Sequence, residues 1–171
     1  MHFHPATVQT SIDTPLGEVH LAASPQGLAG LWFAGQKHLP PSLSGPQAWP
    51  QQAAHPVLQA AASQLQQYLR GERQGFELPL DLSGGTPFQQ AVWQALRTMA
   101  CGQSCSYGAL SRQLGRASAV RAVAAAVGRN PISIVVPCHR VLGADGSLTG
   151  YAGGLERKQA LLALEGTTAR P

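Results

Sequence analysis

The chain is short of charged residues, of cysteines and of long apolar runs, and each shortage excludes a class of protein. Only 12% of its 171 residues are charged and 44% are hydrophobic, which places it among globular proteins. No stretch approaches the roughly 18 apolar residues of a membrane-spanning helix. Residues 1–15 contain no apolar segment of the length found in secretory signals. We therefore expect a cytoplasmic protein without a membrane partner.

Cysteine occurs only three times, as Cys101, Cys105 and Cys138. This odd and sparse set does not form a disulfide framework, so we expect free thiols in a reducing compartment. A metal site made of these cysteines and His139 is an alternative, but the sequence lacks the tightly paired ligands of common zinc sites. The histidines of the first half are scattered, at positions 2, 4, 20, 38 and 55. We therefore expect neither a metal ion nor another cofactor.

Basic residues are concentrated in the second half of the chain. Residues 1–83 hold three Lys or Arg against five Asp or Glu, whereas residues 84–171 hold nine against three. Such asymmetry points to a polyanionic partner for the second half, and nucleic acid is the leading candidate. Many basic surfaces bind nothing, so charge alone does not establish a nucleic-acid partner.

The first half shows the pattern of a small antiparallel sheet followed by a helix. Pro-x-Gly turns separate three β-like runs, at residues 7–13, 18–23 and 28–35. Apolar residues then recur at helical spacing over residues 56–70. Residues 76–82 alternate as an extended segment, which Pro79 confines to a sheet edge or a link. We expect residues 1–83 to form an α/β domain of structural role.

The second half opens with a strong helix signal and continues with the pattern of a helix-turn-helix. Thr86 can cap the first helix, and Gln89 completes a capping box. Ser106 and Ser118 can each cap one of two short helices that are joined by a Gly-containing turn. We expect residues 84–171 to form a mainly helical domain, which makes the whole chain an α/β protein of the α+β type.

The second of these short helices is thin. Five alanines within residues 119–126 leave little bulk, and Arg121 projects from among them. One interpretation is that the alanines allow close helix packing while Arg121 is a solvated surface charge. The other is a helix that approaches a DNA groove closely and inserts Arg121 into it.

Cys138 follows the apolar run 132–136 and Pro137, in the stretch ISIVVPCHRVLG. Apolar surroundings raise the pKa of a thiol, so a buried structural cysteine is one interpretation. Pro137 interrupts the strand pattern, however, and can turn the sulfur toward a ligand. His139 can then serve as a base, provided that a turn or a bridging water links its ring to the sulfur.

A base also needs a group that orients it, and Glu165 is the best placed carboxylate of the second half. It ends a predicted helix in which Leu155, Leu161 and Leu162 supply buried positions. A carboxylate beside such a core requires a partner, and we expect that partner to be His139.

The segment from Gly85 to Gly166 carries a series of short motifs. They are GTPFQ..VW, SYG.L, RAV, NP, PCHRV and GY.GGL..K..LL..EG. In this order and spacing they resemble the O6-alkylguanine-DNA alkyltransferases of bacterial type, which are methylated-DNA-protein-cysteine methyltransferases. The resemblance implies a monomeric repair enzyme that acts once on double-stranded DNA. It would transfer a methyl or other alkyl group from O6 of guanine, or O4 of thymine, to Cys138.

The resemblance also implies roles for individual residues. His139 would be the base acting through water, Glu165 would orient it, and Asn130 would brace the site. Arg121 would enter the base stack in place of the extruded nucleotide. The residues implied to hold that nucleotide are Tyr107, Val141, Tyr151 and Ala152, and those implied to contact DNA are Arg121, Ala122 and Ser118.

Two other functions fit parts of the pattern. A helix-turn-helix regulator could use Cys138 as an alkylation sensor, although a further sequence-reading module does not fit in this length. A cysteine hydrolase would have to turn over, whereas an alkylated thiol offers no easy route back to the free form. We therefore favour single-turnover repair.

Overall fold

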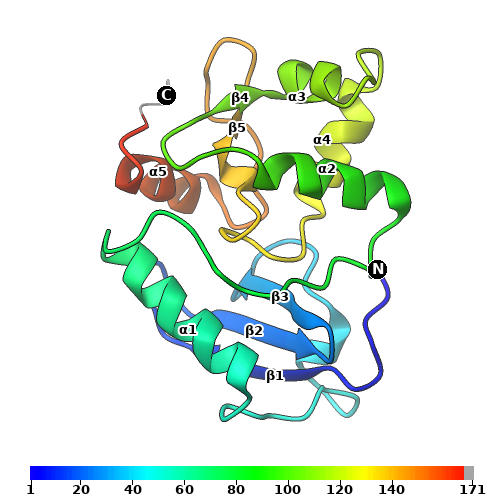
Figure 1. Ribbon diagram of the computed structural model, residues 1–171, viewed down its shortest axis with the longest axis vertical. Coiled ribbons are helices and arrows are strands. Elements are labelled where there is room, and N and C mark those ends of the chain that lie inside the picture. The colour runs from blue at the N-terminus through cyan, green and yellow to red at the C-terminus, as the bar shows by residue number, and fades with distance from the viewer. Residues whose placement is uncertain (168–171) are drawn as a thin grey trace.

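A three-stranded antiparallel sheet crossed by one helix forms the first half of the chain (Figure 1). The structure is a computed structural model that describes residues 1–167. Its strands β1 (Val8–Ile12), β2 (Val19–Ser24) and β3 (Gly27–Phe33) pair in that order, and α1 (Pro56–Leu69) packs on β2 and β3. The predicted meander and the predicted helix over residues 56–70 are confirmed.

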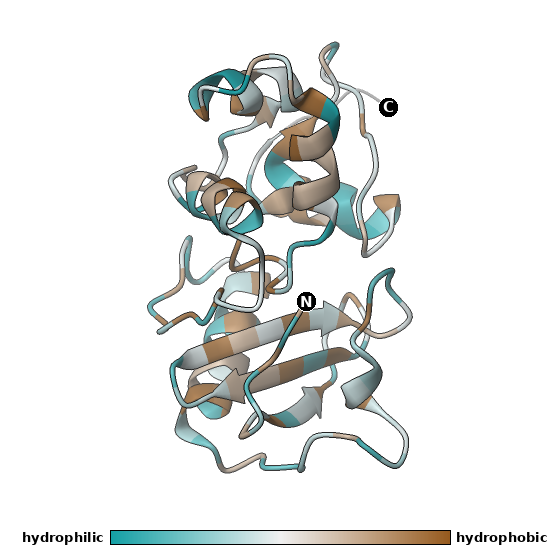
Figure 2. Cartoon of the chain, turned by 90° about the vertical axis from the view of Figure 1, so that its right-hand side faces the viewer, coloured by the Kyte–Doolittle hydropathy of each residue, from teal (hydrophilic) through white to brown (hydrophobic). Residues whose placement is uncertain are grey.

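The second half is mainly helical and stacks on the first, beside the β3 edge of the sheet (Figures 1 and 2). Its elements are α2 (Pro87–Arg97), β4 (Cys105–Ser106), α3 (Tyr107–Gln113), α4 (Val120–Gly128), β5 (Val141–Leu142) and α5 (Leu155–Leu164). The two short strands β4 and β5 pair in parallel. The predicted α+β fold with a helix-turn-helix is confirmed. Within residues 1–167, no helix is both long and apolar enough to cross a membrane.

Two of the three predicted helix caps are present. The Thr86 hydroxyl accepts a hydrogen bond from the Gln89 amide, and the Gln89 side chain accepts one from the Thr86 amide, which completes the capping box. The Ser106 hydroxyl caps α3 by accepting from the Ala109 amide at 3.1 Å. Local sequence therefore sets where α2 and α3 begin.

The third predicted cap, Ser118, is wrong. Helix α4 begins one residue later, with Ala119 as its N-cap and without a side-chain cap hydrogen bond. The Ala119 amide instead donates to the Arg116 carbonyl at 2.8 Å, so a backbone turn precedes the helix. Ser118 is exposed on that turn.

The prediction that Leu155 is buried is also wrong. Leu161 and Leu162 are buried as expected, whereas Leu155 is 47% exposed. It opens α5 and lines a surface groove with Pro15 and Leu16. The buried face of α5 therefore starts after its first turn.

The outer edge of β3 is covered by two segments from elsewhere in the chain. The extended segment 76–82 is the first of these segments. The Leu28 amide donates to the Pro79 carbonyl, and the Asp81 amide donates to the Leu28 carbonyl, both at 2.8 Å. Pro79, which has no N–H to give, thus sits where a sheet edge needs only its carbonyl.

The second segment leads to Cys138. The Leu31 amide donates to the Pro131 carbonyl, and the Ser133 amide donates to the Leu31 carbonyl, both at 2.9 Å. The expected strand over 132–136 does not continue, because the chain turns at Ile134, whose φ is 70°. A β-branched residue rarely adopts this left-handed conformation, so the surrounding contacts hold it there.

An aromatic cluster covers the face of β3 that α1 leaves free. The Trp32 ring lies 5.8 Å from that of Phe3 and 6.3 Å from that of Trp49. The same ring lies over Gly30, where a Cβ atom would come within 1.7 Å of it. The cluster therefore depends on a residue without a side chain at this position.

We expect Gly30→Ala to lower the free energy of unfolding by about 1–3 kcal/mol, because Trp32 must move and overpack its neighbours. Gly75→Ala is the control, since nothing lies within 4 Å of its added Cβ and its φ is ordinary. Urea unfolding followed by tryptophan fluorescence measures both. Equal stability of the Gly30 variant and the wild type would contradict the packing argument.

Candidate active site

Cys138 lies at the start of a short 3-10 turn, Cys138–Arg140, and is only 6% exposed. Its sulfur accepts a hydrogen bond from the Asn130 side-chain nitrogen Nδ2 at 3.0 Å. Burial raises the pKa of the thiol, while the hydrogen bond from Asn130 and the charge of Lys158 oppose that rise. The free protein therefore keeps Cys138 as a thiol whose thiolate form already has two stabilising partners.

Asn130 fixes the backbone around this thiol. Its Nδ2 also donates to the Val136 carbonyl at 2.8 Å, and its Oδ1 accepts from the Ile132 amide at 3.0 Å. Asn130 is 5% exposed and directly follows α4 and its cap residue. One side chain thus ties the end of α4 to the turn that carries Cys138.

His139 is fully buried and lies against Glu165. Its Nε2 is 3.0 Å from Glu165 Oε1. Because an ionised carboxylate only accepts hydrogen bonds, Nε2 carries the proton and Nδ1 is left as the basic nitrogen. Within residues 1–167, Nδ1 has no hydrogen-bond partner. Burial lowers the pKa of His139, although Glu165 opposes this, so the ring is a neutral base at pH 7.

Glu165 is the C-cap residue of α5 and its side chain is 1% exposed. The Arg140 guanidinium donates to Oε1 from Nη2 at 2.7 Å and to Oε2 from Nε at 2.9 Å. The Tyr68 hydroxyl donates to the same Oε1. Burial alone would raise the pKa of this carboxyl, but its hydrogen bonds with His139 and Arg140 hold it far below the usual range.

Arg140 and Tyr68 also contact Glu165, although the sequence did not lead us to expect either residue at this site. Arg140 had a signal, because it is part of the PCHRV motif, and it also donates from Nη1 to the Met99 carbonyl at 2.6 Å. Tyr68 had none, since it precedes Glu165 by 97 positions and belongs to the other half of the chain.

Lys158 is a third residue that the sequence did not lead us to expect. It is fully buried, and its amine donates to the carbonyls of Val141 and Thr149, each at 2.6 Å. Burial lowers the pKa of this amine to about 8. Its two bonds join β5 to the loop that leads to Tyr151. Val141 is one of the residues implied to hold the nucleotide, and its carbonyl already has one donor.

Of the remaining residues implied to hold a nucleotide, Tyr107 and Tyr151 lie close enough to Cys138 to interact with it electrostatically. Tyr107 is half-buried at the start of α3, and its hydroxyl donates to the Gly150 carbonyl at 3.4 Å. Burial raises the pKa of Tyr107 and that of Tyr151. Ala152 is half-buried, and its carbonyl accepts from the Lys37 amide at 3.1 Å.

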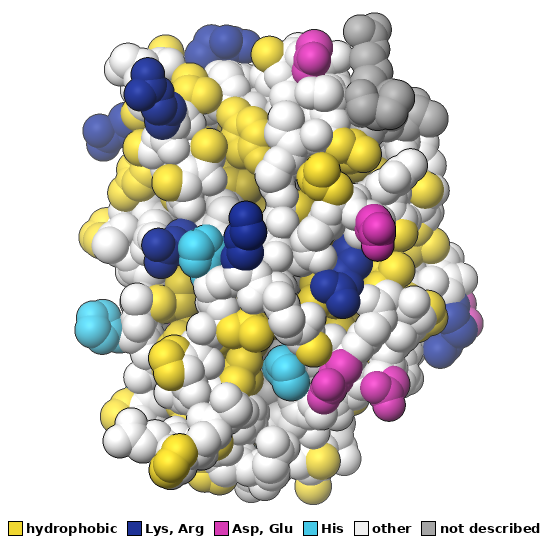
Figure 3. All heavy atoms as spheres, turned by 180° about the vertical axis from the view of Figure 1, so that it is seen from behind, with side chains coloured by type: hydrophobic (Ala, Val, Ile, Leu, Met, Phe, Trp, Pro, Cys, Tyr) yellow, Lys and Arg dark blue, Asp and Glu magenta, His cyan; other side chains and the backbone are white. Residues whose placement is uncertain are grey.

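The residues implied to contact DNA lie on the surface of the helix-turn-helix. Arg121, Ala122 and Ser118 are all exposed. Figure 3 shows Lys and Arg side chains over the part of the molecule that holds α3 and α4. The exposed arginines of these two helices and their flanking turns are Arg112, Arg116, Arg121 and Arg129. The helix-turn-helix thus carries a basic surface that includes the thin helix α4, and Asn130 connects this helix to Cys138.

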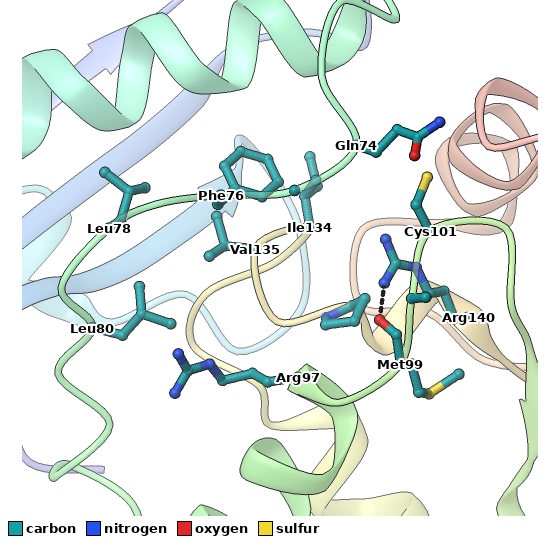
Figure 4. Close-up of a pocket in the computed structure, with 13 residues that line it drawn as sticks. Gln74, Phe76, Leu78, Leu80, Arg97, Met99, Cys101, Ile134, Val135 and Arg140 are labelled. Carbon is teal, nitrogen blue, oxygen red and sulfur yellow. Dashed lines mark hydrogen bonds between the residues drawn. The ribbon is translucent and has the colours of Figure 1, made fainter.

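A cavity of about 470 Å³ lies between the 74–80 segment, the end of α2 and the turn before Cys138. Figure 4 shows Phe76 and Ile134 on one side, and Arg140 and Cys101 on the other. Burial and the charge of Glu165 raise the pKa of the Cys101 thiol. Cys138 does not line this cavity.

No group of three His, Cys, Asp or Glu side chains in residues 1–167 is arranged to hold a metal ion. The three cysteines are free, and the one with a hydrogen-bonded sulfur beside a histidine–carboxylate pair is Cys138. The arrangement suits a buried cysteine nucleophile.

Family models of known proteins match both halves of the chain. The family model described as "6-O-methylguanine DNA methyltransferase, ribonuclease-like domain" matches residues 7–82. The model described as "6-O-methylguanine DNA methyltransferase, DNA binding domain" matches residues 87–167. The chain belongs to the 6-O-methylguanine DNA methyltransferase family.

Individual relatives of this 6-O-methylguanine DNA methyltransferase family member carry a consistent name. A methylated-DNA--protein-cysteine methyltransferase of Mycolicibacterium paratuberculosis is 46% identical over 155 residues, which cover 91% of this chain and 90% of that protein. A protein of the same name from Salmonella typhimurium is 67% identical over 84 residues, 49% of each chain.

A crystal structure of Mycobacterium tuberculosis OGT in complex with DNA has the same fold. It is 44% identical, has a TM-score of 0.80, and the match covers 91% of this chain and 90% of that chain. The O6-methylguanine-DNA methyltransferase of Pyrococcus kodakaraensis, which is 24% identical and has a TM-score of 0.57, shares the fold.

We expect Glu165→Gln to lower the free energy of unfolding of this family member by about 3–5 kcal/mol at pH 7, because Arg140 is left without its counter-ion. Folding lowers the Glu165 pKa, so its contribution is present above its unfolded value of about 4.3 and disappears as pH falls further. The difference from the wild type should therefore shrink on acidification.

Urea unfolding at a series of pH values from neutral to about pH 3 measures this difference. Glu156→Gln, at an exposed carboxylate in the first turn of the same helix, is the matched control. A loss for Glu165→Gln that stays constant across the series would contradict the assignment.

Proposed function

We propose that the protein repairs alkylated DNA directly, by transferring an alkyl group from O6 of guanine to Cys138 in a single turnover. The observation that supports this most strongly is the buried Cys138 thiol, hydrogen-bonded to Asn130 and followed by a His139–Glu165 pair. Relatives that carry the name methylated-DNA--protein-cysteine methyltransferase support the same proposal. O4-alkylthymine is a second substrate of the same chemistry.

In the proposed reaction His139 Nδ1 takes the proton of the Cys138 thiol. Neighbouring side chains point apart, so a bridging water carries the proton between them. The thiolate then attacks the alkyl carbon, a sulfur–carbon bond forms and the carbon–O6 bond breaks. The electron pair stays with guanine, which takes up one proton. Glu165 stabilises the imidazolium that forms meanwhile.

Double-stranded DNA is the proposed partner. The alkylated base has to leave the stack to reach a buried sulfur, and a damaged pair costs less to open than an intact one. Arg121 would fill the gap in the stack, while Ala122 and Ser118 lie against the groove. Tyr107, Val141, Tyr151 and Ala152 are the residues proposed to surround the extruded base.

Residues 84–171 are the proposed DNA-binding and transfer domain and residues 1–83 the proposed supporting domain. The last four residues, including the basic Arg170, lie outside the described residues. Free thiols favour a reducing compartment, so we place the protein in the cytoplasm as part of the same proposal. A regulator that merely senses alkylation is not favoured, since the relatives are named as methyltransferases.

Incubation with duplex DNA carrying O6-methylguanine should leave one methyl group per chain, located on Cys138 by peptide mass analysis. Transfer should then stop, because a thioether does not return to a thiol. Cys138→Ser should abolish transfer, whereas Cys101→Ala and Cys105→Ala should retain it. Repeated turnover, or transfer that survives Cys138→Ser, would overturn the proposal.

We expect Arg121→Ala to slow transfer from duplex DNA by about tenfold and to affect single-stranded DNA less, because only a duplex needs its stack refilled. Single-turnover rates on the two substrates measure the effect. Arg112→Ala, at an exposed arginine of α3, is the control for loss of positive charge alone. Equal losses on both substrates would argue against insertion of Arg121.

A further inference from the structure

Tyr68 reaches the transfer site from the other half of the chain. It is the penultimate residue of α1 and is 2% exposed. Its ring packs on Phe76 with centroids 5.2 Å apart, and its hydroxyl donates to Glu165 Oε1. The residue therefore sits at the junction of the two halves with its polar end on the carboxylate that faces His139.

The direction of this hydrogen bond is determined by charge. Burial and the contact with Glu165 raise the pKa of Tyr68, so the phenol keeps its proton. Glu165 remains ionised because its own pKa is held far below the usual range. An ionised carboxylate has no proton to give, so the hydroxyl donates and the carboxylate accepts.

The donors around Glu165 do not contribute in the same way. Oε1 accepts from Tyr68, from His139 at 3.0 Å and from Arg140 at 2.7 Å. Oε2 accepts from Arg140 Nε at 2.9 Å and lies 3.4 Å from the Gly102 amide. Tyr68 is the neutral hydroxyl among the donors to the oxygen that His139 uses. The Tyr68 hydroxyl withdraws electron density from Oε1 and limits the rotation of the carboxylate.

We propose that Tyr68 is a positioning residue for alkyl transfer: it holds Glu165 Oε1 in the orientation that presents His139 Nδ1 to the Cys138 thiol. The inference rests on the proposed transfer function. It gives the N-terminal half a part in the chemistry, because the hydroxyl acts on the cysteine through Glu165 and His139.

Loss of the hydroxyl has two consequences. The carboxylate becomes a stronger acceptor from His139, which makes the ring harder to deprotonate, and it gains freedom to turn away. The charged or titratable groups facing His139 are Glu165, Arg140 and Lys158, and Tyr68 and Cys101 also face Glu165. All of these except Tyr68 remain in Tyr68→Phe.

The test is the pH profile of Cys138 alkylation in Tyr68→Phe. We expect the rate of single-turnover transfer to fall about tenfold at pH 7, and the acidic limb of the profile to move about half a unit or more to higher pH. Reaction of Cys138 with iodoacetamide, without DNA, should show the same displacement. Leu65→Val, one turn earlier on α1 and fully buried, is the control for lost packing.

A Tyr68→Phe protein that is less stable but keeps the wild-type profile would overturn the proposal, as would an equal displacement in Leu65→Val. If Tyr68→Phe does not fold, 3-fluorotyrosine placed at position 68 replaces it, because it is a stronger donor of nearly the same size. It should move the limb to lower pH, and an unchanged limb would overturn the proposal. Wild-type protein that reacts with iodoacetamide but removes no methyl from DNA would refute the proposed function instead.

Discussion

The buried Glu165 carboxylate accepts hydrogen bonds from both halves of the chain. Removing a charge from water costs several kcal/mol, and a buried carboxylate is tolerated only when its oxygens are fully paired. Here the partners come from α1 and from the turn Cys138–Arg140, which supplies both His139 and Arg140, while Glu165 itself ends α5. The cost of burying one charge thus forces three distant segments to meet, and the nucleophile's loop is one of them.

Burial of Cys138 is compatible with its proposed chemistry for the same reason. Burial raises the pKa of the thiol and so suppresses its reaction with electrophiles in solution. The groups that stabilise the thiolate are already in place, as an amide donor from Asn130 and a nearby buried amine on Lys158. A protein that reacts once gains more from protecting its thiol than from keeping it ionised at all times.

Local patterns predicted what depends on local geometry. The meander, α1, the Thr86 capping box and the Ser106 cap are confirmed, since turn residues and caps act within a few positions. The His139–Glu165 contact was predicted because a buried carboxylate needs a partner, and the two side chains do meet. The contacts of Tyr68 and Lys158 could not be predicted from local patterns, because tertiary packing determines their partners. The run before Cys138 was mistaken for a strand because β-branched residues favour strands, whereas its backbone follows Asn130 and the β3 edge.

The two halves of the chain are coupled through more than a covalent link. The edge of β3 hydrogen-bonds the segment that enters the Cys138 turn, at Pro131 and Ser133. The Tyr68 hydroxyl donates a hydrogen bond to Glu165, the residue that ends α5. The N-terminal half therefore contacts the segment before the Cys138 turn directly, and it contacts the turn's His139 indirectly, through Glu165. A sheet whose strands carry no nucleophile can in this way determine how rigidly the nucleophile and its base are held. The Cys138 turn is therefore supported by the sheet edge as well as by the helical half.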